Sequence, residues 1–377
     1  MEKVKKVVII GGHATPAIAL IDDLEKKSNL RIYFFGRRHS TEGDNADSME
    51  YKFLADRKNV SFVQITSGRL QRSFTIHTIP SLTKIPVGFF QSFFHLVRIR
   101  PNVVVGFGGY LSVPIIISAA ILRIPIFIHE QTSIPGLSIK ITAKFASKVF
   151  ISFKRSQKYF DSKKTIFSGN LLRKEILSPA SVCDPELKNF LSRKHTQIIY
   201  VTGGGQGSRM LNNFIIDNLE KLFTTRFSFI IQTGSLDNQQ SFNLLSEKIS
   251  RHPDKANRFF VRQHFTSQQV AGIFQKKPIV FGRSGANTVC EIVFFKLKAI
   301  FVPLDIAAGS EQMVNAKLLA NSDLARIIPA SALNVDSFLD SLNSLNALDP
   351  KSSGDQINEE IRIDTDGILS RAVISTI

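Results

Sequence analysis

Cysteine is scarce in this sequence, and long apolar runs are absent. The 377 residues include two cysteines, Cys183 and Cys290, with no CxxC pair and no cluster of histidines. This spacing argues against a zinc site and against a disulfide framework, and it fits a reducing cytoplasm. The longest apolar stretch, around Val113–Leu122, is too short to cross a bilayer, so any membrane contact must be peripheral. The first apolar run, Val7–Ile10, is too short for a signal peptide and predicts a strand.

Acidic residues are outnumbered by basic ones. The chain has 48 Lys and Arg against 31 Asp and Glu, a net charge of +17. Such an excess favours an anionic partner, namely nucleic acid, an acidic membrane surface or a phosphate-bearing substrate, although a merely soluble basic surface gives the same count. A hydrophobic content of 43% and a charged content of 21% are typical of a globular protein. The length suits two domains.

Strand-like apolar runs alternate with helix-like segments almost throughout the chain. In the first half we predict strands at Val7–Ile10, Arg31–Phe35, Ser61–Ile65, Val103–Phe107, Ile124–Ile128 and Lys148–Ile151, and helices at Pro16–Lys27, Ser112–Leu122 and Leu137–Phe145. In the second half we predict strands at Ile198–Thr202, Phe227–Gln232, Phe259–Arg262, Pro278–Phe281, Ala299–Val302 and Ala325–Ile328, and helices at Ser208–Phe223, Asn238–Ser250, Ala286–Phe295 and Glu311–Ala320. The alternation predicts an α/β fold with parallel sheets covered by helices on both faces.

This organisation repeats along the chain. One apolar strand runs into Gly11-Gly12, and a second, Gln197–Thr202, runs into Gly203–Gly207. Each predicts the first βα turn of a Rossmann-like domain, with the boundary between Ile166 and His195. Open parallel sheets bind ligands beyond the carboxyl ends of their strands, so we expect the ligand in a cleft between two domains.

The segment Arg283–Glu291 follows a predicted strand and begins a helix near Gly285. The free backbone N–H groups and the positive dipole end of such a helix suit a diphosphate. Glu291, inside the helix, offers a carboxylate that can accept hydrogen bonds from a ribose. The helix start alone fits an ordinary turn with a structural glutamate equally well. Together with Gly309–Asn315 and the motifs below, it looks like the nucleotide-sugar half of a glycosyltransferase.

Gly11-Gly12-His13 closes the first strand, where glycines let the backbone approach a phosphate. His13 would lie at the carboxyl edge of the sheet, either as a base for an attacking hydroxyl or as a helix-start histidine with no chemistry. For His129 and Glu130 a pair that braces a loop is favoured over a catalytic dyad. Gly203–Gly207 lacks the Lys-Ser/Thr of a Walker loop and the acidic residue of a dinucleotide site, which disfavours dinucleotide binding.

Phenylalanines recur at helical spacing in Thr83–Arg100. A helix with this apolar face and basic flank would contact a membrane surface through Phe90 and Phe94. The alternative is a core helix packed against the sheet. The residues that fit a core position are Phe89, Phe93 and Val97.

Taken in order, these motifs resemble those of the MurG family, peripheral membrane N-acetylglucosaminyltransferases that make lipid II for peptidoglycan. The resemblance covers roughly residues 5–330. The motifs that carry it are Gly11-Gly12-His13, Gly106–Tyr110, His129–Gln131, Gly169–Arg173, Thr202–Ser208, Arg283–Ala286 and Glu311-Gln312.

The resemblance implies an α/β fold of the GT-B type, two Rossmann-like domains with parallel sheets facing across a cleft. Residues 1–168 would take the acceptor, lipid I, and associate with the membrane. Residues 169–377 would bind UDP-N-acetylglucosamine, and it stays open whether the C-terminal tail packs back on the N-terminal domain.

The implied reaction is inverting transfer of N-acetylglucosamine from UDP-N-acetylglucosamine to the 4-hydroxyl of the muramoyl sugar of lipid I, undecaprenyl-pyrophosphoryl-MurNAc-pentapeptide. The product is lipid II, for cell-wall synthesis. The resemblance also implies a peripheral position on the cytoplasmic face of the cell membrane, with an anionic membrane surface as a partner. No DxD-like metal motif is evident at a strand end beside the donor site, so we expect no metal requirement.

Site residues carry over motif by motif. The implied donor-binding residues are Thr132, Arg173, Gly205, Ala286, Asn287, Thr288, Val289, Cys290, Glu291 and Gln312. The acceptor pyrophosphate would lie near Gly11, Gly12, Gly106, Gly108 and Gly109. His13 matches the histidine of the family's first glycine loop and would be the catalytic base.

This sequence departs from the family pattern at several positions. The family's first loop usually reads Gly-Gly-Thr-Gly-Gly-His, so the loop that ends at His13 is shorter here. Thr132 stands where the family usually has Asn, and Gly205 stands where it usually has Ser or a similar residue. Cys290 stands where the family usually has Ser. The first two changes would each lower affinity by about 1–2 kcal/mol wherever the family side chain makes a hydrogen bond.

The shorter first loop keeps a second hypothesis open, a GT-B enzyme that glycosylates another lipid. A third is a non-catalytic nucleotide- or lipid-binding relative, for which the basic charge and the segment around Phe89–Phe94 would be sufficient. Nucleic-acid binding is disfavoured, because no basic-aromatic recognition motif interrupts the two-domain pattern.

Overall fold

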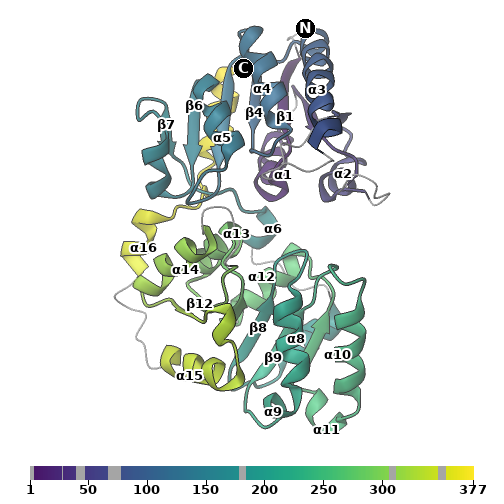
Figure 1. The fold of residues 1–377 in the computed structure, drawn as a ribbon, viewed down its shortest axis with the longest axis vertical. Helices are drawn as coiled ribbons and strands as arrows, with labels where there is room; N and C mark the ends of the chain where they lie inside the picture. The colour runs from purple at the N-terminus through teal and green to yellow at the C-terminus, as the bar shows by residue number, and fades with distance from the viewer. Residues whose placement is uncertain are drawn as a thin grey trace. The chain divides into compact units, whose positions relative to one another are not determined.

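The chain forms two compact units, each an α/β domain built on one parallel sheet (Figure 1). The computed structural model describes residues 4–27, 29–39, 47–66, 78–177, 184–304, 311–346 and 354–377. One unit comprises Met1–Arg173 with Arg362–Ile377, and the other comprises Lys174–Ile361. The α/β class with two parallel sheets, predicted from the alternation of elements, is confirmed.

The sheet of the first unit has seven parallel strands in the order β3-β2-β1-β4-β5-β6-β7. They are β1 (Lys5–Ile10), β2 (Leu30–Gly36), β3 (Val60–Gln64), β4 (Val103–Gly106), β5 (Ile126–Glu130), β6 (Lys148–Ile151) and β7 (Thr165–Phe167). This is a doubly wound order that reverses direction between β1 and β4. Open α/β sheets bind ligands at such a switch point, beyond the carboxyl ends of the strands.

Helices cover both faces of this sheet. They are α1 (Ala14–Leu24), α2 (Met49–Leu54), α3 (Thr78–Ile99), α4 (Ser112–Ile121), α5 (Leu137–Thr142) and α17 (Ile368–Thr376), with 3₁₀ turns at Ala143–Phe145 and Lys154–Tyr159. Side chains along β1 alternate between the faces: Val7 and Ile9 cluster with α1 and α17, whereas Val8 and Ile10 cluster with α3, α4 and α5. Burial on both faces explains why these strands are continuous apolar runs in the sequence.

The second unit repeats this plan with six parallel strands in the order β10-β9-β8-β11-β12-β13. They are β8 (Ile198–Thr202), β9 (Ser228–Gln232), β10 (Phe259–Arg262), β11 (Ile279–Gly282), β12 (Lys298–Phe301) and β13 (Ala325–Ile327). The order again reverses in the middle, here between β8 and β11. Both units therefore carry a switch point next to the first strand of their sheet.

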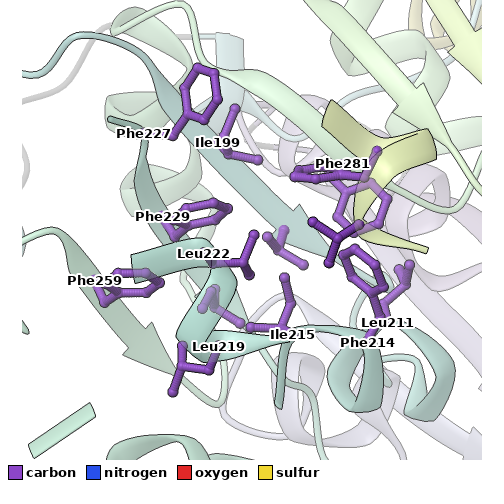
Figure 2. Close-up of a cluster of buried hydrophobic side chains, with 14 of the residues drawn as sticks. Ile199, Leu211, Phe214, Ile215, Leu219, Leu222, Phe227, Phe229, Phe259 and Phe281 are labelled. Carbon is purple, nitrogen blue, oxygen red and sulfur yellow. The ribbon is translucent and has the colours of Figure 1, made fainter. Parts of the chain in front are cut away.

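The helices of the second unit enclose a large aromatic core. They are α6 (Lys174–Leu177), α7 (Pro185–Ser192), α8 (Arg209–Asp217), α9 (Leu219–Phe223), α10 (Gln240–Ser250), α11 (Pro253–Ala256), α12 (Ser267–Gln275), α13 (Ala286–Phe295), α14 (Glu311–Asn321), α15 (Val335–Asn346) and α16 (Gly354–Glu360), with a 3₁₀ turn at Ala330–Ala332. Figure 2 shows Leu211 and Phe214 of α8 gathered against Ile199 and Phe281 of the sheet. The rings of Phe214 and Phe281 meet edge to face, 5.5 Å apart.

The last segment of the chain returns to the first unit. The N–H of Asn170 donates to the carbonyl of Arg362 at 2.8 Å, and the N–H of Asp364 donates to the carbonyl of Asn170 at 2.9 Å. Helix α17 then buries Leu369 and Val373 in the same cluster as α1. The tail thus completes the core of the unit that holds the N-terminus.

Local differences from the expected elements have simple causes. Strand β7 was not predicted, because three half-buried residues give too short an apolar run. The helix expected at Ser208–Phe223 is interrupted at Asn218, whose φ of −111° and ψ of 12° are not helical. The prediction that Val97 belongs to the core is wrong: it is 41% exposed, and Leu96 and Ile99 turn α3 toward the sheet instead.

Candidate active site

Two glycine turns meet at the switch point of the first unit. Gly11 and Gly12 follow β1, and Gly108 and Gly109 follow β4 with φ of +84° and +75°. An added Cβ on Gly12 would lie 2.5 Å from the carbonyl carbon of Gly108, and one on Gly109 would lie 3.0 Å from the Cα of Gly12. The two turns are therefore in backbone contact, and only glycine permits this approach.

His13 stands beside this contact, at the start of α1. Its Nδ1 lies 2.7 Å from the carbonyl oxygen of Phe107. Because a carbonyl only accepts, Nδ1 carries the proton, and Nε2 of the neutral ring keeps a lone pair. Burial lowers the pKa of His13 below its ordinary value, and the hydrogen bond to Phe107 opposes this only in part. The ring is thus held neutral and oriented, as a general base requires.

His129 and Glu130, at the end of β5, are buried and internally bonded. His129 Nε2 lies 3.0 Å from the carbonyl of Gly169, and burial lowers the pKa of His129 to about 4. Glu130 accepts the backbone N–H of Thr132 at 2.7 Å, and the Thr132 hydroxyl lies 2.6 Å from the same carboxylate oxygen. These contacts agree with a bracing role for the His129–Glu130 pair. Thr132 itself is 7% exposed.

Arg173 ends the first unit, after β7. Its guanidinium lies over the ring of Phe53, 5.3 Å from the centroid. Its Nε is buried and has no hydrogen-bond partner among the described residues. The side chain is therefore oriented by stacking, with donor capacity left for a ligand.

In the second unit the glycine-rich turn Gly203–Gly207 follows β8. Gly204 and Gly207 have φ of +83° and +90°, and Gly205 is exposed at the tip of the turn. Gln232, at the end of β9, donates to the carbonyl of Gly204 at 3.0 Å and accepts the N–H of Phe265 at 3.1 Å. A buried amide thus holds the turn in shape.

Helix α13 begins next to this turn, after β11. Several other helices start at a side chain that accepts a free N–H, as Thr266 does for α12, but Gly285 gives α13 no such cap. Among the described residues, an added Cβ on Gly285 would meet nothing within 4 Å. The first N–H groups of α13 therefore have no side-chain cap, and together with the positive dipole end they suit an anion.

The residues implied as donor ligands on α13 divide into two sets. Ala286, Val289 and Cys290 are buried. Asn287, Thr288 and Glu291 are half-buried and, at positions i, i+1 and i+4, share one side of the helix. Only the second set can offer side chains to a ligand, so Ala286, Val289 and Cys290 would contribute through the backbone or through packing.

Helix α14 is fastened to the start of α13. The Ser284 hydroxyl donates to the carbonyl of Gln312 at 2.7 Å, and the Asn315 amide donates to the carbonyl of Ser284 at 3.0 Å. Gln312 Oε1 accepts the N–H of Leu304 at 3.0 Å. Burial raises the pKa of Glu311, and a hydrogen bond from Asn315 opposes the rise. These contacts fix Gln312 and Glu311 beside the uncapped start of α13.

The sequence prediction missed three residues that shape these turns: Ser284, Asn315 and Gln232. Ser284 and Asn315 lay inside recognised motifs, but nothing in their spacing showed that they bond to each other. Gln232 had no motif at all. A buried amide at the end of a central strand is recognisable only once the sheet order is known.

Three structural observations concern the predicted membrane contact and the expected absence of a metal. Phe90 and Phe94 are 69% and 63% exposed on α3. Within the described ranges, no helix is both long and apolar enough to cross a membrane. Among the residues that the structure describes, no group of three or more His, Cys, Asp or Glu side chains could hold a metal ion.

Two Rossmann-like units, each with glycine turns at its switch point, define a GT-B type α/β fold. The chain belongs to glycosyltransferase family 28: the N-terminal domain of the family matches residues 10–151, and the C-terminal domain matches residues 198–361. The chain is therefore a glycosyltransferase, and the resemblance predicted from its motifs is confirmed.

Named relatives match both units. The chain is 31% identical, over 316 residues, to the UDP-N-acetylglucosamine–N-acetylmuramyl-(pentapeptide) pyrophosphoryl-undecaprenol N-acetylglucosamine transferase of Borreliella burgdorferi, covering 83% of this chain and 79% of that protein. It is 28% identical to the enzyme of the same name from Clostridium botulinum, covering 94% and 97%. The crystal structure of Acinetobacter baumannii MurG superposes with a TM-score of 0.68 over 98% of this chain and 99% of that one. At 22% identity, this last likeness shows the fold.

Proposed function

We propose that this chain transfers N-acetylglucosamine from UDP-N-acetylglucosamine to the 4-hydroxyl of the muramoyl sugar of lipid I, giving lipid II. The observation that carries the proposal is the match to transferases of this name through both units, at 31% identity for the Borreliella enzyme. The geometry of each switch point supports it, since one presents an oriented histidine and the other a helix start without a side-chain cap.

In this proposal the second unit binds the donor. The diphosphate of UDP lies at the uncapped start of α13, where N–H groups and the helix dipole offset its charge. Glu291 accepts hydrogen bonds from the ribose, with Asn287 and Thr288 on the same side of the helix. Gln312 contacts the hydroxyls of the sugar. Gly205 gives the neighbouring turn the exposed backbone that a close ligand needs.

The remaining donor residues are assigned by their motifs alone. Arg173 faces the nucleotide and supports the leaving diphosphate, which agrees with its stacked guanidinium and its Nε without a partner among the described residues. Thr132 contributes by holding the turn after β5, because its hydroxyl already bonds to Glu130.

The first unit takes the acceptor, with its diphosphate near Gly11, Gly12 and the Gly106–Gly109 turn. The 4-hydroxyl attacks the anomeric carbon from the face opposite UDP, so the configuration inverts. Nε2 of His13 removes the hydroxyl proton as the new bond forms. The bond to UDP breaks, and its developing charge is stabilised by the start of α13.

Membrane association belongs to the proposal as a peripheral contact through α3, on the cytoplasmic face. Phe90 and Phe94 are exposed, and Arg98 and Arg100 lie at the end of the helix. Replacing both phenylalanines by serine should lower the fraction of protein that sediments with anionic vesicles while leaving transfer to a short-chain acceptor unchanged. Equal sedimentation of wild type and variant would remove α3 from membrane binding.

The test is transfer of labelled N-acetylglucosamine from UDP-N-acetylglucosamine to a short-chain lipid I analogue, with EDTA present. Labelled product establishes the reaction and its independence of free divalent metal together. Calorimetric binding of UDP-N-acetylglucosamine without any product would reject lipid I as the acceptor. The shorter loop before His13 would then favour the second candidate, a family member that glycosylates another lipid.

A further inference from the structure

Arg37 reaches across the end of a strand in the first unit. It directly follows β2, and its guanidinium lies over the ring of Tyr110, 5.0 Å from the centroid. Tyr110 follows the glycine turn after β4. In the sheet β2 and β4 are not neighbours, because β1 lies between them. Adjacent strands are about 4.8 Å apart, so the side chains of Arg37 and Tyr110 together bridge the carboxyl end of β1.

The backbone under this arch is the turn at Gly11 and Gly12. The N–H of Gly11 donates to the carbonyl of Phe35 at 2.9 Å, which ties the turn to the end of β2. Gly12 is exposed, and helix α1 starts behind it with no side-chain cap and no acidic residue in its first turn. A cation, an exposed glycine backbone and an uncapped helix start therefore all lie at the carboxyl edge of the sheet, at or beside β1.

Arg37 and its neighbour Arg38 differ in the ion pairs that they form. Arg38 forms an ion pair with Asp47 at 3.3 Å and lies over the ring of Tyr51. No ion pair involves Arg37 within the described parts of the chain. Its backbone is nevertheless fixed, since the Ser48 hydroxyl donates to the Arg37 carbonyl at 2.7 Å. Stacking on Tyr110 orients the guanidinium, and no ion pair among the described residues compensates its charge.

We propose that Arg37, oriented by Tyr110, binds the diphosphate of the acceptor and so positions the acceptor hydroxyl for His13. The inference rests on the proposed function for the identity of the acceptor. The guanidinium presents two parallel N–H donors, which match two phosphate oxygens in a way that an ammonium cannot. Arg37 thereby adds a positive charge to the subsite that the glycine turns form for the diphosphate.

The first experiment compares Arg37→Met with the matched control Arg38→Met in steady-state transfer to a short-chain lipid I analogue. For Arg37→Met we expect the acceptor KM to rise about tenfold or more, as for the loss of a hydrogen bond to a charged group. The KM for UDP-N-acetylglucosamine and the thermal midpoint should not change. Arg38→Met should match the wild type in both KM values, and loss of its exposed ion pair with Asp47 should lower the thermal midpoint by no more than about 4 °C.

A second readout does not depend on transfer. Geranyl diphosphate, a soluble prenyl diphosphate, is titrated into wild type, Arg37→Met, Arg37→Lys and Arg38→Met by calorimetry. Arg37→Met should bind it about tenfold more weakly, and Arg37→Lys should recover part of the affinity because the charge returns without the fork. Arg38→Met should bind as the wild type does.

The outcomes separate this inference from the proposed function. Arg37-dependent binding of geranyl diphosphate by a wild type that does not glycosylate lipid I would support the subsite and reject the function. Active transfer with an unchanged acceptor KM in Arg37→Met would overturn the subsite and keep the function. A rise in the KM for UDP-N-acetylglucosamine, or an equal loss in Arg38→Met, would also overturn it, since the charge would then act on the donor or without specificity.

Discussion

Replacing Gly12 by alanine tests whether the contact between the two glycine turns supports acceptor binding. The new Cβ would lie 2.5 Å from the carbonyl carbon of Gly108 and 3.0 Å from the backbone nitrogen of Gly109. Both neighbours are backbone, so no side chain can rotate away. Ordinary contact between carbon atoms begins at about 3.5 Å, and the turns must therefore separate by about 1 Å.

This separation has two expected effects. Overpacking of this kind typically costs about 1–3 kcal/mol of stability, and each kcal/mol lowers the thermal midpoint of a unit of this size by about 2–4 °C. Displacing His13 and the acceptor turn by about 1 Å should lower kcat/KM for the acceptor about a hundredfold. UDP-N-acetylglucosamine affinity should stay the same, because the donor residues assigned to α13 lie in the other unit.

Gly136→Ala is the matched control in the same unit. Gly136 has a φ of −67°, and an added Cβ there would meet nothing within 4 Å. Because Gly136 is the N-cap residue of α5, where alanine is less favourable than glycine, we expect a stability loss of no more than about 1 kcal/mol and normal kinetics. Thermal unfolding gives the stability of the two variants, and acceptor titrations give their kcat/KM. Wild-type stability and kcat/KM in Gly12→Ala would refute the argument that these turns are held at contact distance.

Three further predictions concern single side chains. His13→Ala should lower kcat about 10²–10⁴-fold. The wild-type rate should fall as the pH drops through the lowered pKa of His13, below 6.5, because the base then becomes charged. A pH–rate profile unchanged by the mutation would exclude His13 as the base. His129 binds a proton near the ordinary histidine pKa of 6.5 in the unfolded chain but only near pH 4 in the folded protein. Its contribution to stability is therefore complete above pH 6.5 and falls by about 2 kcal/mol between pH 7 and pH 5. The unfolding free energy of His129→Gln should lose most of this pH dependence, and an identical pH dependence in both proteins would count against the role of His129. Glu291→Gln should weaken UDP binding about tenfold or more with no change in the acceptor KM, and equal calorimetric UDP affinity would remove its ribose role.

The strands and glycine turns were predictable from the sequence because their causes are local. A parallel strand buried on both faces must be an unbroken apolar run, and Val7–Ile10 and Ile198–Thr202 are such runs. Where two backbones approach closely glycine is required, and the sequence shows this requirement directly as a glycine pair such as Gly11-Gly12. The family resemblance followed from the same turns, since they are where chemistry limits the choice of residue.

The rotation of each helix about its axis depended on tertiary packing. In α13 the sequence offered six candidate ligands, and the packing buries Ala286, Val289 and Cys290 while leaving the Glu291 side partly open. In α3 the apolar residues outnumber those that the sheet can cover, so the pattern alone placed Val97 on the wrong side. A periodic apolar stripe defines a face only when the neighbouring surface is known.

What the sequence determined by itself was the α/β class, the repeated plan and the residue types at both switch points, because propensity and backbone sterics act over a few neighbours. Only the tertiary structure decided that Arg37 reaches Tyr110, that Gln232 holds the Gly204 turn, and that residues 362–377 complete the first unit. These contacts join residues far apart in the chain, and they exist only once the strand order brings them to the same edge of a sheet. No local pattern encodes that order, since it is set by the free energy of packing the whole domain.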